Sequence, residues 1–493
     1  MWSFLLDTIP TWVPIFLYSF DFLVILVMVF WDRKQPRSIM IWFLLFILAP
    51  VFGFVFYVLL GKGPQINRLR WAKIKVATDE KTREQTQEKN VKLYKDTSNN
   101  NEYHRINELI TMNSNNGFPC TVNNKCEYFV DANDMYKKQL EDIKNAKNSI
   151  NMMYYIFKKD AAGKMFLNAL VEKQKEGVQV TVLYDSAANR FLHHFLRPLK
   201  KAGGHIESFF GTKNLIFDLL NSSYRNHRKI TVIDGKIAYV GGMNIGVDYM
   251  GQDKRIKPWR DTSMRIEGDA VSMLQTRFFQ DLLSNNSKAS NKDLEQIMNQ
   301  KDVFYPKHEE VGNTPIQIVS SGPDTQKEEI KLTYQKMISL ARKEIYLESP
   351  YFVPDKSFID SVILAQKSGI QVHLIIPGVR DHIMVYYVTL SNLQQLLDAG
   401  VRVYTYNGFI HSKMVVADEL VASIGSANLD ERSFGLNFEV NAVIYDKNDV
   451  IKCKEMALKD IENSVEIDRE KFRNRSKLLK LKENFFRILS PIM

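Results

Sequence analysis

The residues best suited to do chemistry form a short motif that occurs twice, with a histidine, a lysine two residues later and an aspartate five residues after that. The two copies are His227, Lys229 and Asp234, and His411, Lys413 and Asp418, aligned without a gap at an offset of 184 residues. Because side chains at positions i and i+2 of an extended segment point the same way, each copy offers an imidazole beside an ammonium. A single His-x-Lys is most often structural, but its duplication favours catalysis.

This set of side chains fits displacement at a phosphodiester. The anionic phosphate oxygens repel a nucleophile, so a metal-free site needs fixed cations and hydrogen-bond donors around phosphorus. A neutral imidazole can attack phosphorus, while a protonated one gives its proton to the leaving alcohol. The residues expected to hold phosphate beside the two lysines are Asn244, Asn428 and Ser426, with Gly241, Gly242 and Gly425 allowing close backbone approach.

The nearby carboxylates have two different expected tasks. Asp234 and Asp418 lie seven residues after their histidines, an odd separation that places them on the opposite face, near a turn. We expect them to stabilise that turn rather than to touch substrate. Each histidine also needs a partner on its second ring nitrogen to fix its orientation, and Asp261 and Glu439 are the candidates for that role.

The other histidines and the cysteines have no comparable setting. The remaining histidines are not repeated, so we expect surface or packing roles for His104, His193, His194, His205, His308, His373 and His382. Closely spaced sets of Cys, His and carboxylate are missing from the sequence, so we expect neither a metal ion nor a cofactor. The three cysteines are interpreted as free thiols in a reducing compartment.

The segments around the two motifs also repeat, and this repeat predicts the fold. Each half has the order helix, strand, helix, strand, and then a further strand before the motif. The predicted strands, rich in Val, Ile and Leu, are 178–184, 206–210, 370–376 and 401–406. We therefore predict an α/β fold of two half-domains, each a mixed sheet flanked by helices, packed as a pseudo-twofold pair.

Two long apolar segments precede these halves. Residues 39–60 are 22 residues without a charge, enough to cross a hydrocarbon core of roughly 30 Å. Residues 11–31 are nearly as apolar, although Asp21 in mid-span costs about 2.5 to 3.5 kcal/mol. The sequence therefore predicts an N-terminal transmembrane hairpin. Three basic residues lie between the segments and five follow the second, which favours a multi-pass protein of the cell membrane with a cytoplasmic main body.

Composition completes the predicted organisation. The predicted parts are a membrane hairpin (1–62), a polar linker (63–110), the first half (111–283), a linker between halves (284–312), the second half (313–465) and a basic tail (466–493). In the tail, Leu478, Leu481, Phe485 and Leu489 recur at helical spacing among eight Lys or Arg. This pattern fits either a helix on an anionic membrane surface or a solvated helix packed on the body. The net charge of +10 suits anionic partners.

Longer segments resemble a known family. HRKITVID and HSKMVVAD, trailed by GGMN and GSAN, resemble the paired signature of the phospholipase D superfamily. WRDTSMRIEG, ESPYFVPD and IGSANLDERSFGLNFEVNAVIYD extend the resemblance to bacterial cardiolipin synthases over most of the chain. The resemblance implies two halves sharing one site, with His227 as the nucleophile that carries a phosphatidyl group and His411 as acid and then base. It also implies transfer between two phosphatidylglycerol molecules with release of glycerol.

The sequence leaves open which molecule accepts the phosphatidyl group. With water as acceptor the protein would be a membrane-bound phospholipase D, and with another alcohol a different phosphatidyltransferase. Transfer requires only that a glycerol hydroxyl outcompete water in a screened pocket, which the sequence does not decide. The membrane hairpin argues against a nucleic-acid substrate.

Overall fold

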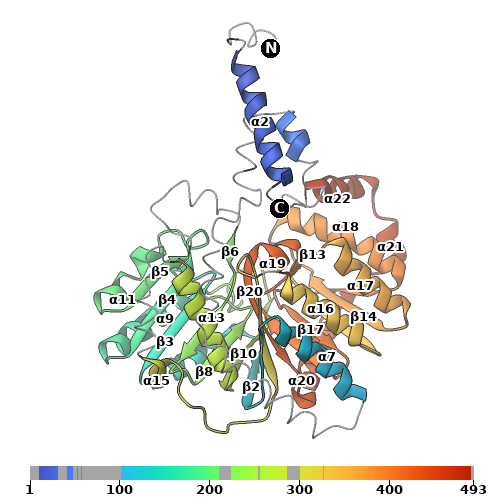
Figure 1. Cartoon of the computed structure of the whole chain (residues 1–493). Helices are drawn as coiled ribbons and strands as arrows, with labels where there is room; N and C mark the ends of the chain where they lie inside the picture. The colour runs from blue at the N-terminus through green and yellow to red at the C-terminus, as the bar shows by residue number, and fades with distance from the viewer. Residues whose placement is uncertain are drawn as a thin grey trace. The chain divides into compact units, whose positions relative to one another are not determined.

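The structure covers two compact units, which are described separately. The computed structural model describes residues 10, 12–30, 42–47, 53, 57, 101–209, 224–253, 256–285, 300–325 and 327–489. The larger unit, 68–211 and 225–487, contains both motifs, and the smaller comprises 1–67, 212–224 and 488–493. Figure 1 shows the elements of both units along the chain.

The first half is built on a seven-stranded mixed sheet of order β2-β10-β8-β7-β3-β4-β5. Its strands are β2 (Asn124–Phe129), β3 (Ser149–Tyr154), β4 (Gln179–Asp185), β5 (His205–Phe209), β7 (Ile230–Ile233), β8 (Ile237–Gly241) and β10 (Ser263–Gly268). β3, β4 and β5 run parallel, and the other pairs are antiparallel. The main helices are α8 (Ala132–Asn145), α9 (Ala161–Lys175) and α13 (Ala270–Asn285). Asp131 and Asp160 cap α8 and α9 by accepting backbone N–H bonds.

The second half repeats this strand order. Its sheet runs β1-β11-β20-β18-β17-β12-β14-β15-β21, and the seven strands from β11 to β15 correspond one by one to the first sheet. They are β11 (Ile316–Ser321), β12 (Glu344–Glu348), β14 (Gln371–Pro377), β15 (Arg402–Tyr406), β17 (Met414–Ala417), β18 (Val421–Gly425) and β20 (Asn437–Ile444). The main helices are α16 (Glu329–Leu340), α17 (Lys356–Lys367), α18 (Ile383–Ala399) and α20 (Lys447–Glu462). The predicted repeat of mixed α/β halves is confirmed.

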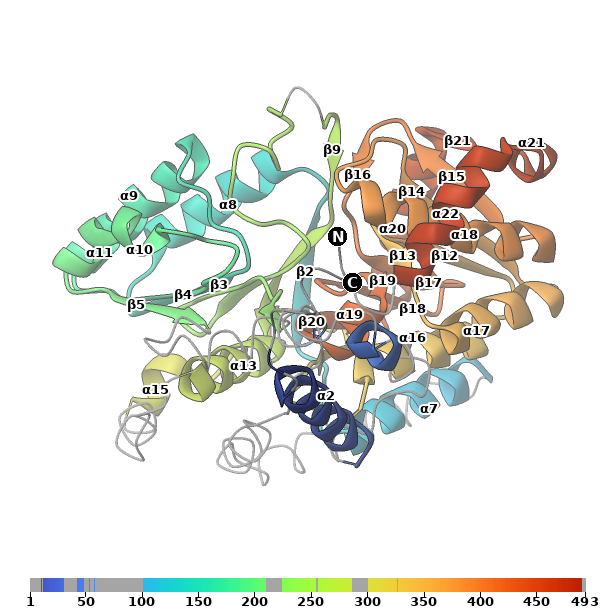
Figure 2. The ribbon, with the colours of Figure 1, turned by 90° about the horizontal axis from the view of Figure 1, so that it is seen from above.

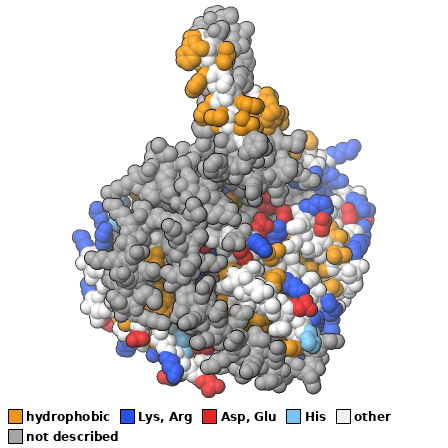
Figure 3. All heavy atoms as spheres, viewed as in Figure 1, with side chains coloured by type: hydrophobic (Ala, Val, Ile, Leu, Met, Phe, Trp, Pro, Cys, Tyr) orange, Lys and Arg blue, Asp and Glu red, His pale blue; other side chains and the backbone are white. Residues whose placement is uncertain are grey.

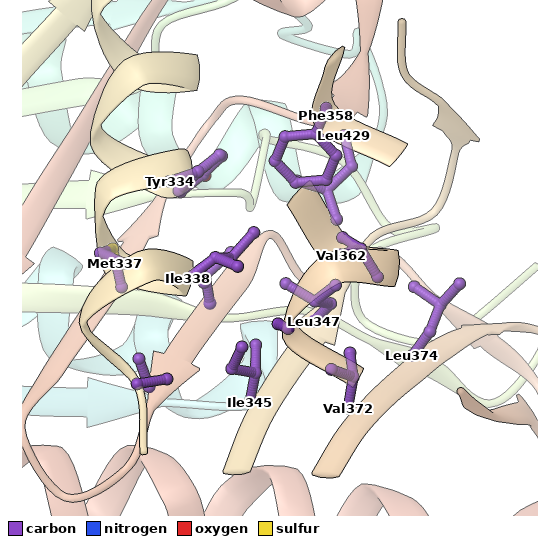
Figure 4. Close-up of a cluster of buried hydrophobic side chains, with 14 of the residues drawn as sticks. Tyr334, Met337, Ile338, Ile345, Leu347, Phe358, Val362, Val372, Leu374 and Leu429 are labelled. Carbon is purple, nitrogen blue, oxygen red and sulfur yellow. The ribbon is translucent and has the colours of Figure 1, made fainter. Parts of the chain in front are cut away.

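The predicted strands lie close to the observed ones. The segments 178–184, 206–210, 370–376 and 401–406 correspond within one residue to β4, β5, β14 and β15. β4, β14 and β15 were predictable because they are mostly buried, as parallel strands covered by helices are. Figure 4 shows one face of the second sheet, where Ile338 of α16, Leu347 of β12 and Val362 of α17 meet in one buried cluster.

The predicted linker 63–110 is too long at its C-terminal end. Residues Asn101–Asn115 form helix α7, whose apolar side chains Ile106, Leu109 and Ile110 are buried in the core of the second half. β1 (Cys120–Thr121) then pairs with β11. The predicted first half, 111–283, therefore begins with residues that belong to the second sheet. Residues 63–100 lie outside the described residues, as do 286–299 of the linker between halves.

In the smaller unit, helix α2 (Trp12–Phe30) occupies the first predicted membrane segment. Its Val24 and Ile25 pack against a buried cluster that includes Trp42 and Tyr57. The Trp42 and Tyr57 rings pack edge to face, with centroids 5.3 Å apart. Most of the second predicted segment, 39–60, lies outside the described residues.

Among the residues that the structure describes, no helix is both long enough and apolar enough to cross a membrane.

Candidate active site

Each motif histidine lies in a connection between two strands rather than within a strand. His227 follows β6 (Arg225–Asn226) and His411 follows β16 (Phe409–Ile410). β6 pairs in parallel with β20 of the second half, and β16 pairs in parallel with β9 (Trp259–Arg260) of the first. The backbone N–H of His227 donates to the carbonyl of Phe438 at 3.0 Å, and that of His411 to the carbonyl of Arg260 at 2.6 Å. Each histidine is thus positioned by the opposite half.

The carboxylate partners of the histidines cross between the halves in the same way. Nδ1 of His227 lies 3.0 Å from Oε1 of Glu439, and Nδ1 of His411 lies 2.6 Å from Oδ2 of Asp261. Both carboxylates are buried. Because each Nδ1 faces a carboxylate, Nε2 is the ring nitrogen left for substrate. The sequence identified both carboxylates without assigning either to a histidine, and the structure makes that assignment.

The two lysines are buried beside their own histidines. Nζ of Lys229 donates to the carbonyl oxygen of His227 at 2.6 Å, and Nζ of Lys413 donates to that of His411. Burial lowers the pKa of Lys229 to about 7 and that of Lys413 to about 8, although Glu439 and Asp261 oppose the shift. The charge of Lys413 also helps lower the pKa of Lys229, so the two ammonium groups belong to one site. An anion bound between them would favour their charged forms.

Both histidines are neutral near pH 7 when no anion is bound. Burial lowers the pKa of His411 to about 4, with Lys413 adding to the shift and Asp261 opposing it. Burial also lowers the pKa of His227, and Glu439 opposes that shift. A neutral imidazole is a nucleophile, so the site has one ready. The other histidine has to be protonated to act as an acid. A bound phosphodiester anion would raise the pKa of that histidine by offsetting the lysine charges.

Two of the expected phosphate donors, Ser426 and Asn244, form hydrogen bonds with other protein groups. Ser426 donates its hydroxyl to Oε2 of Glu439. Asn244 accepts the backbone N–H of Ile156 at 3.0 Å and donates to the hydroxyl of Tyr249 at 2.9 Å. These hydrogen bonds position neighbouring groups, which the sequence did not reveal. Oδ1 of Asn428 is buried without a hydrogen-bond partner among the described residues.

The glycines after each motif make room for buried polar side chains. A Cβ on Gly242 would lie 2.1 Å from Oδ1 of Asp261, and a Cβ on Gly425 would lie 2.2 Å from Oδ1 of Asn441. Gly241 has φ +156, and its Cβ would lie 2.3 Å from the Ser263 hydroxyl. The space at Gly242 is therefore filled by the carboxylate of Asp261, which orients His411. The sequence had instead suggested that this glycine lets the backbone approach the substrate.

The motif aspartates bind backbone amides at the start of neighbouring strands. Asp234 and Asp418 both have positive φ, +54 and +53. Each carboxylate accepts three consecutive backbone N–H groups, at 2.6 to 3.0 Å, from Lys147, Asn148 and Ser149 in the first half and Arg342, Lys343 and Glu344 in the second. These contacts join the turn after each motif to β3 or β12, in keeping with the expected turn role.

Several residues that contact the histidines or their carboxylates were not predicted as site residues. The ring of Tyr155 lies 4.6 Å from that of His227, and the ring of Trp259 lies 5.3 Å from that of His411. Arg228, fully buried within the first motif, donates to the carbonyl of Glu439 at 3.0 Å and pairs with Asp281. In the sequence, Trp259 directly precedes Arg260 and Asp261. Arg228 lies between His227 and Lys229 of the first motif. Their positions next to predicted site residues were the signals that could have identified them.

Within the described residues, no three or more His, Cys, Asp or Glu side chains are arranged to hold a metal ion.

Comparison with known proteins shows the family. Residues 140–255 and 334–461, which include both motifs, match the family described as cardiolipin synthase, phospholipase D-like domain. A cardiolipin synthase of Staphylococcus aureus is 41% identical over 471 residues, covering 94% of this chain and 93% of the relative. This chain belongs to the cardiolipin synthase family. Cardiolipin synthase 2 of Staphylococcus epidermidis is 40% identical over 474 residues, covering 95% of each chain.

The fold is also found in a solved structure. A phosphatidylserine synthase from Haemophilus influenzae has a TM-score of 0.58, covers 78% of this chain and 100% of its own, and is 15% identical. At that identity the likeness shows the shared fold alone. The cardiolipin synthase family and the phospholipase D-like fold thus agree with the two-half architecture described above.

Proposed function

We propose that this protein makes cardiolipin by transferring a phosphatidyl group from one phosphatidylglycerol to a glycerol hydroxyl of another, reversibly and with release of glycerol. The observation that carries the proposal is the reciprocal pair of histidines, each held at Nδ1 by a buried carboxylate of the opposite half. The names of the curated relatives support the choice of lipid.

The first step forms a covalent lipid intermediate. Nε2 of His227 attacks phosphorus, a P–N bond forms, and the bond from phosphorus to the glycerol oxygen breaks. His411 gives its proton to that oxygen, and glycerol leaves. Glu439 stabilises the charge that develops on the His227 ring, while Lys229 and Lys413 stabilise the phosphate oxygens.

The second step consumes the intermediate. His411, now neutral, takes the proton of a glycerol hydroxyl on the second phosphatidylglycerol. That oxygen attacks phosphorus, the P–N bond breaks, and cardiolipin is released with His227 regenerated. Water in place of the second lipid would give phosphatidate, the phospholipase D reaction, so the acceptor decides between the two functions.

The deciding experiment supplies purified full-length protein with phosphatidylglycerol vesicles in the presence of a chelator and identifies the products. We expect cardiolipin and glycerol in equal amounts, and added glycerol should drive cardiolipin back to phosphatidylglycerol. Phosphatidate as the sole lipid product would replace the proposal with hydrolysis. Loss of all turnover with the chelator, restored by a divalent cation, would contradict the metal-free mechanism.

We further propose that the N-terminal segment anchors the protein in the cell membrane as the predicted two-pass hairpin, with the main body cytoplasmic. Figure 3 shows apolar side chains gathered on α2, and its exposed large ones are Trp12, Ile15, Phe16, Phe20, Phe22, Leu23 and Leu26. Soluble proteins rarely expose so continuous an apolar surface. The distribution of basic residues around the predicted spans supports the orientation.

Cysteine labelling on intact cells tests this topology. In a two-pass hairpin with a cytoplasmic body, Gln35→Cys between the spans should react with a membrane-impermeant maleimide outside the cell. Lys356→Cys on the exposed side of α17 should react only after permeabilisation, and the parent chain measures the background from its own cysteines. Labelling of Lys356→Cys on intact cells would reverse the orientation, and protection of both sites would contradict the two passes.

A further inference from the structure

The C-terminal helix α22 (Lys477–Leu489) is attached to the body with its apolar face outward. Leu478, Leu481 and Phe485 are 64%, 66% and 59% exposed, whereas Glu483 on the same helix is 2% exposed. A helix that merely packed on the body would bury its apolar stripe and expose its carboxylate. The arrangement is the reverse, so the stripe has no partner within the larger unit.

Specific contacts fix this orientation. Arg475 forms two hydrogen bonds to Glu483, with Nε to Oε1 at 2.8 Å, and also donates to Gln394 of α18 at 2.9 Å. The ring of Phe486 stacks on that of Tyr387, also in α18, with centroids 5.4 Å apart and planes at 2°. Figures 1 and 2 both show α22 lying beside α18. The helix is therefore held by its polar and aromatic side, which leaves the leucines free.

The surroundings of the stripe are basic. Between Arg469 and Arg487 the chain has eight Lys or Arg and two Glu. Arg475 is paired with Glu483, and Arg469 and Arg473 are paired with Asp398 of α18. Lys477 and Lys482 are exposed beside the leucines. An apolar stripe flanked by ammonium groups fits the boundary between the acyl chains and the headgroups of an anionic bilayer.

The same surface continues toward the active site. Tyr387 lies one turn after Ile383 and Met384, which are exposed at the start of α18. Asp381, two residues before Ile383, accepts a hydrogen bond from the hydroxyl of Tyr351. Tyr351 directly precedes β13 (Phe352–Val353), which pairs in parallel with β19 (Leu429–Asp430), the strand that follows the site residue Asn428. The start of α18 is thus connected through Tyr351 and β13 to the edge of the active site.

We propose that the exposed stripe of α22, together with the first turn of α18, docks on an anionic phospholipid bilayer and holds the active site against the surface from which substrate is taken. The inference rests on the proposed function, because it assumes that the substrate is a bilayer lipid. It adds a second membrane contact, separate from the N-terminal anchor, whose task is to orient the site.

A fluorescent label tests the contact in the full-length protein. Leu481→Cys carrying an environment-sensitive fluorophore is reconstituted in vesicles of phosphatidylcholine alone or mixed with phosphatidylglycerol. We expect a blue shift and protection from iodide with the mixed vesicles, weakened by high salt. The same label at Val465→Cys, equally exposed on β21 (Ser464–Glu466), should not shift. Equal spectra at both positions would overturn the proposal.

Turnover separates this inference from the proposed function. The triple change of Leu478, Leu481 and Phe485 to Gln should lower cardiolipin formation in vesicles by about tenfold, because most of the apolar contact is lost. In detergent micelles, where no surface has to be found, turnover should stay within about twofold of the parent. The matched control changes Val130, Leu364 and Val465 to Gln, which are exposed apolar residues elsewhere on the body.

The remaining outcomes are also decisive. No cardiolipin from the parent chain in either system would refute the proposed function itself. Unchanged turnover of the triple variant in vesicles, with an active parent, would refute the docking surface alone. A spectral shift in detergent that follows protein concentration would assign the stripe to a second copy of the chain and overturn the lipid contact.

Discussion

Replacing either His227 or His411 by alanine is expected to lower cardiolipin formation by about 10⁴-fold or more, because each ring carries out a step that no neighbour can take over. Both side chains lie in one site, with Nδ1 on a buried carboxylate and Nε2 left for chemistry. Product formation from phosphatidylglycerol vesicles measures the loss. The control is His205→Ala, whose exposed ring lies on strand β5.

The two variants should differ in what they accumulate. A phosphatidyl group on His227 forms and decays, so enzyme denatured in base during turnover should carry lipid on that residue. Substrate with an activated leaving group needs no proton from His411, so His411→Ala should still form the adduct and hold it. His227→Ala should form none. Lipid trapped on His411 instead would exchange the roles of nucleophile and acid.

The chemistry of the site was predictable because its main residues lie in short sequence motifs. The spacing of His, Lys and Asp and the apolar strands around it are properties of neighbouring residues, and the duplication is found by comparing two such short segments. Helix α7 was missed for the opposite reason: its Ile106, Leu109 and Ile110 are few among polar residues, and their partners lie more than 200 residues away in the second half. Burial of that kind is decided by the assembled core, not by the segment.

The pairing of histidines with carboxylates could not be read from the sequence either. Asp261 follows His227, and Glu439 follows His411, so order along the chain offers each histidine a partner in its own half. In the structure each histidine instead pairs with the carboxylate of the opposite half. This happens because β6 pairs with β20 and β16 pairs with β9, so the start of each motif lies against the other half. Pairing of two-residue strands between halves leaves no local signature.

That exchange predicts which variants should behave alike. Asp261→Asn is expected to resemble His411→Ala, and Glu439→Gln to resemble His227→Ala, each with a loss of about 10²- to 10⁴-fold, because an amide cannot stabilise a charged imidazole and favours the wrong tautomer. The substrate is phosphatidyl-p-nitrophenol, whose nitrophenolate leaves without a proton. Rapid mixing then separates the burst of nitrophenolate, which reports adduct formation, from the steady rate, which reports adduct breakdown.

Glu439→Gln should slow the burst itself, because the ring that attacks phosphorus loses its partner. Asp261→Asn should retain the burst and slow the steady rate, because His411 is needed as a base for the second lipid. Asp360→Asn, an exposed carboxylate on α17, controls for the loss of a charge, and thermal melting checks that the buried variants fold. If Asp261→Asn abolished the burst while Glu439→Gln kept it, each carboxylate would serve the histidine of its own half. The strand exchange would then not be what orients the catalytic rings.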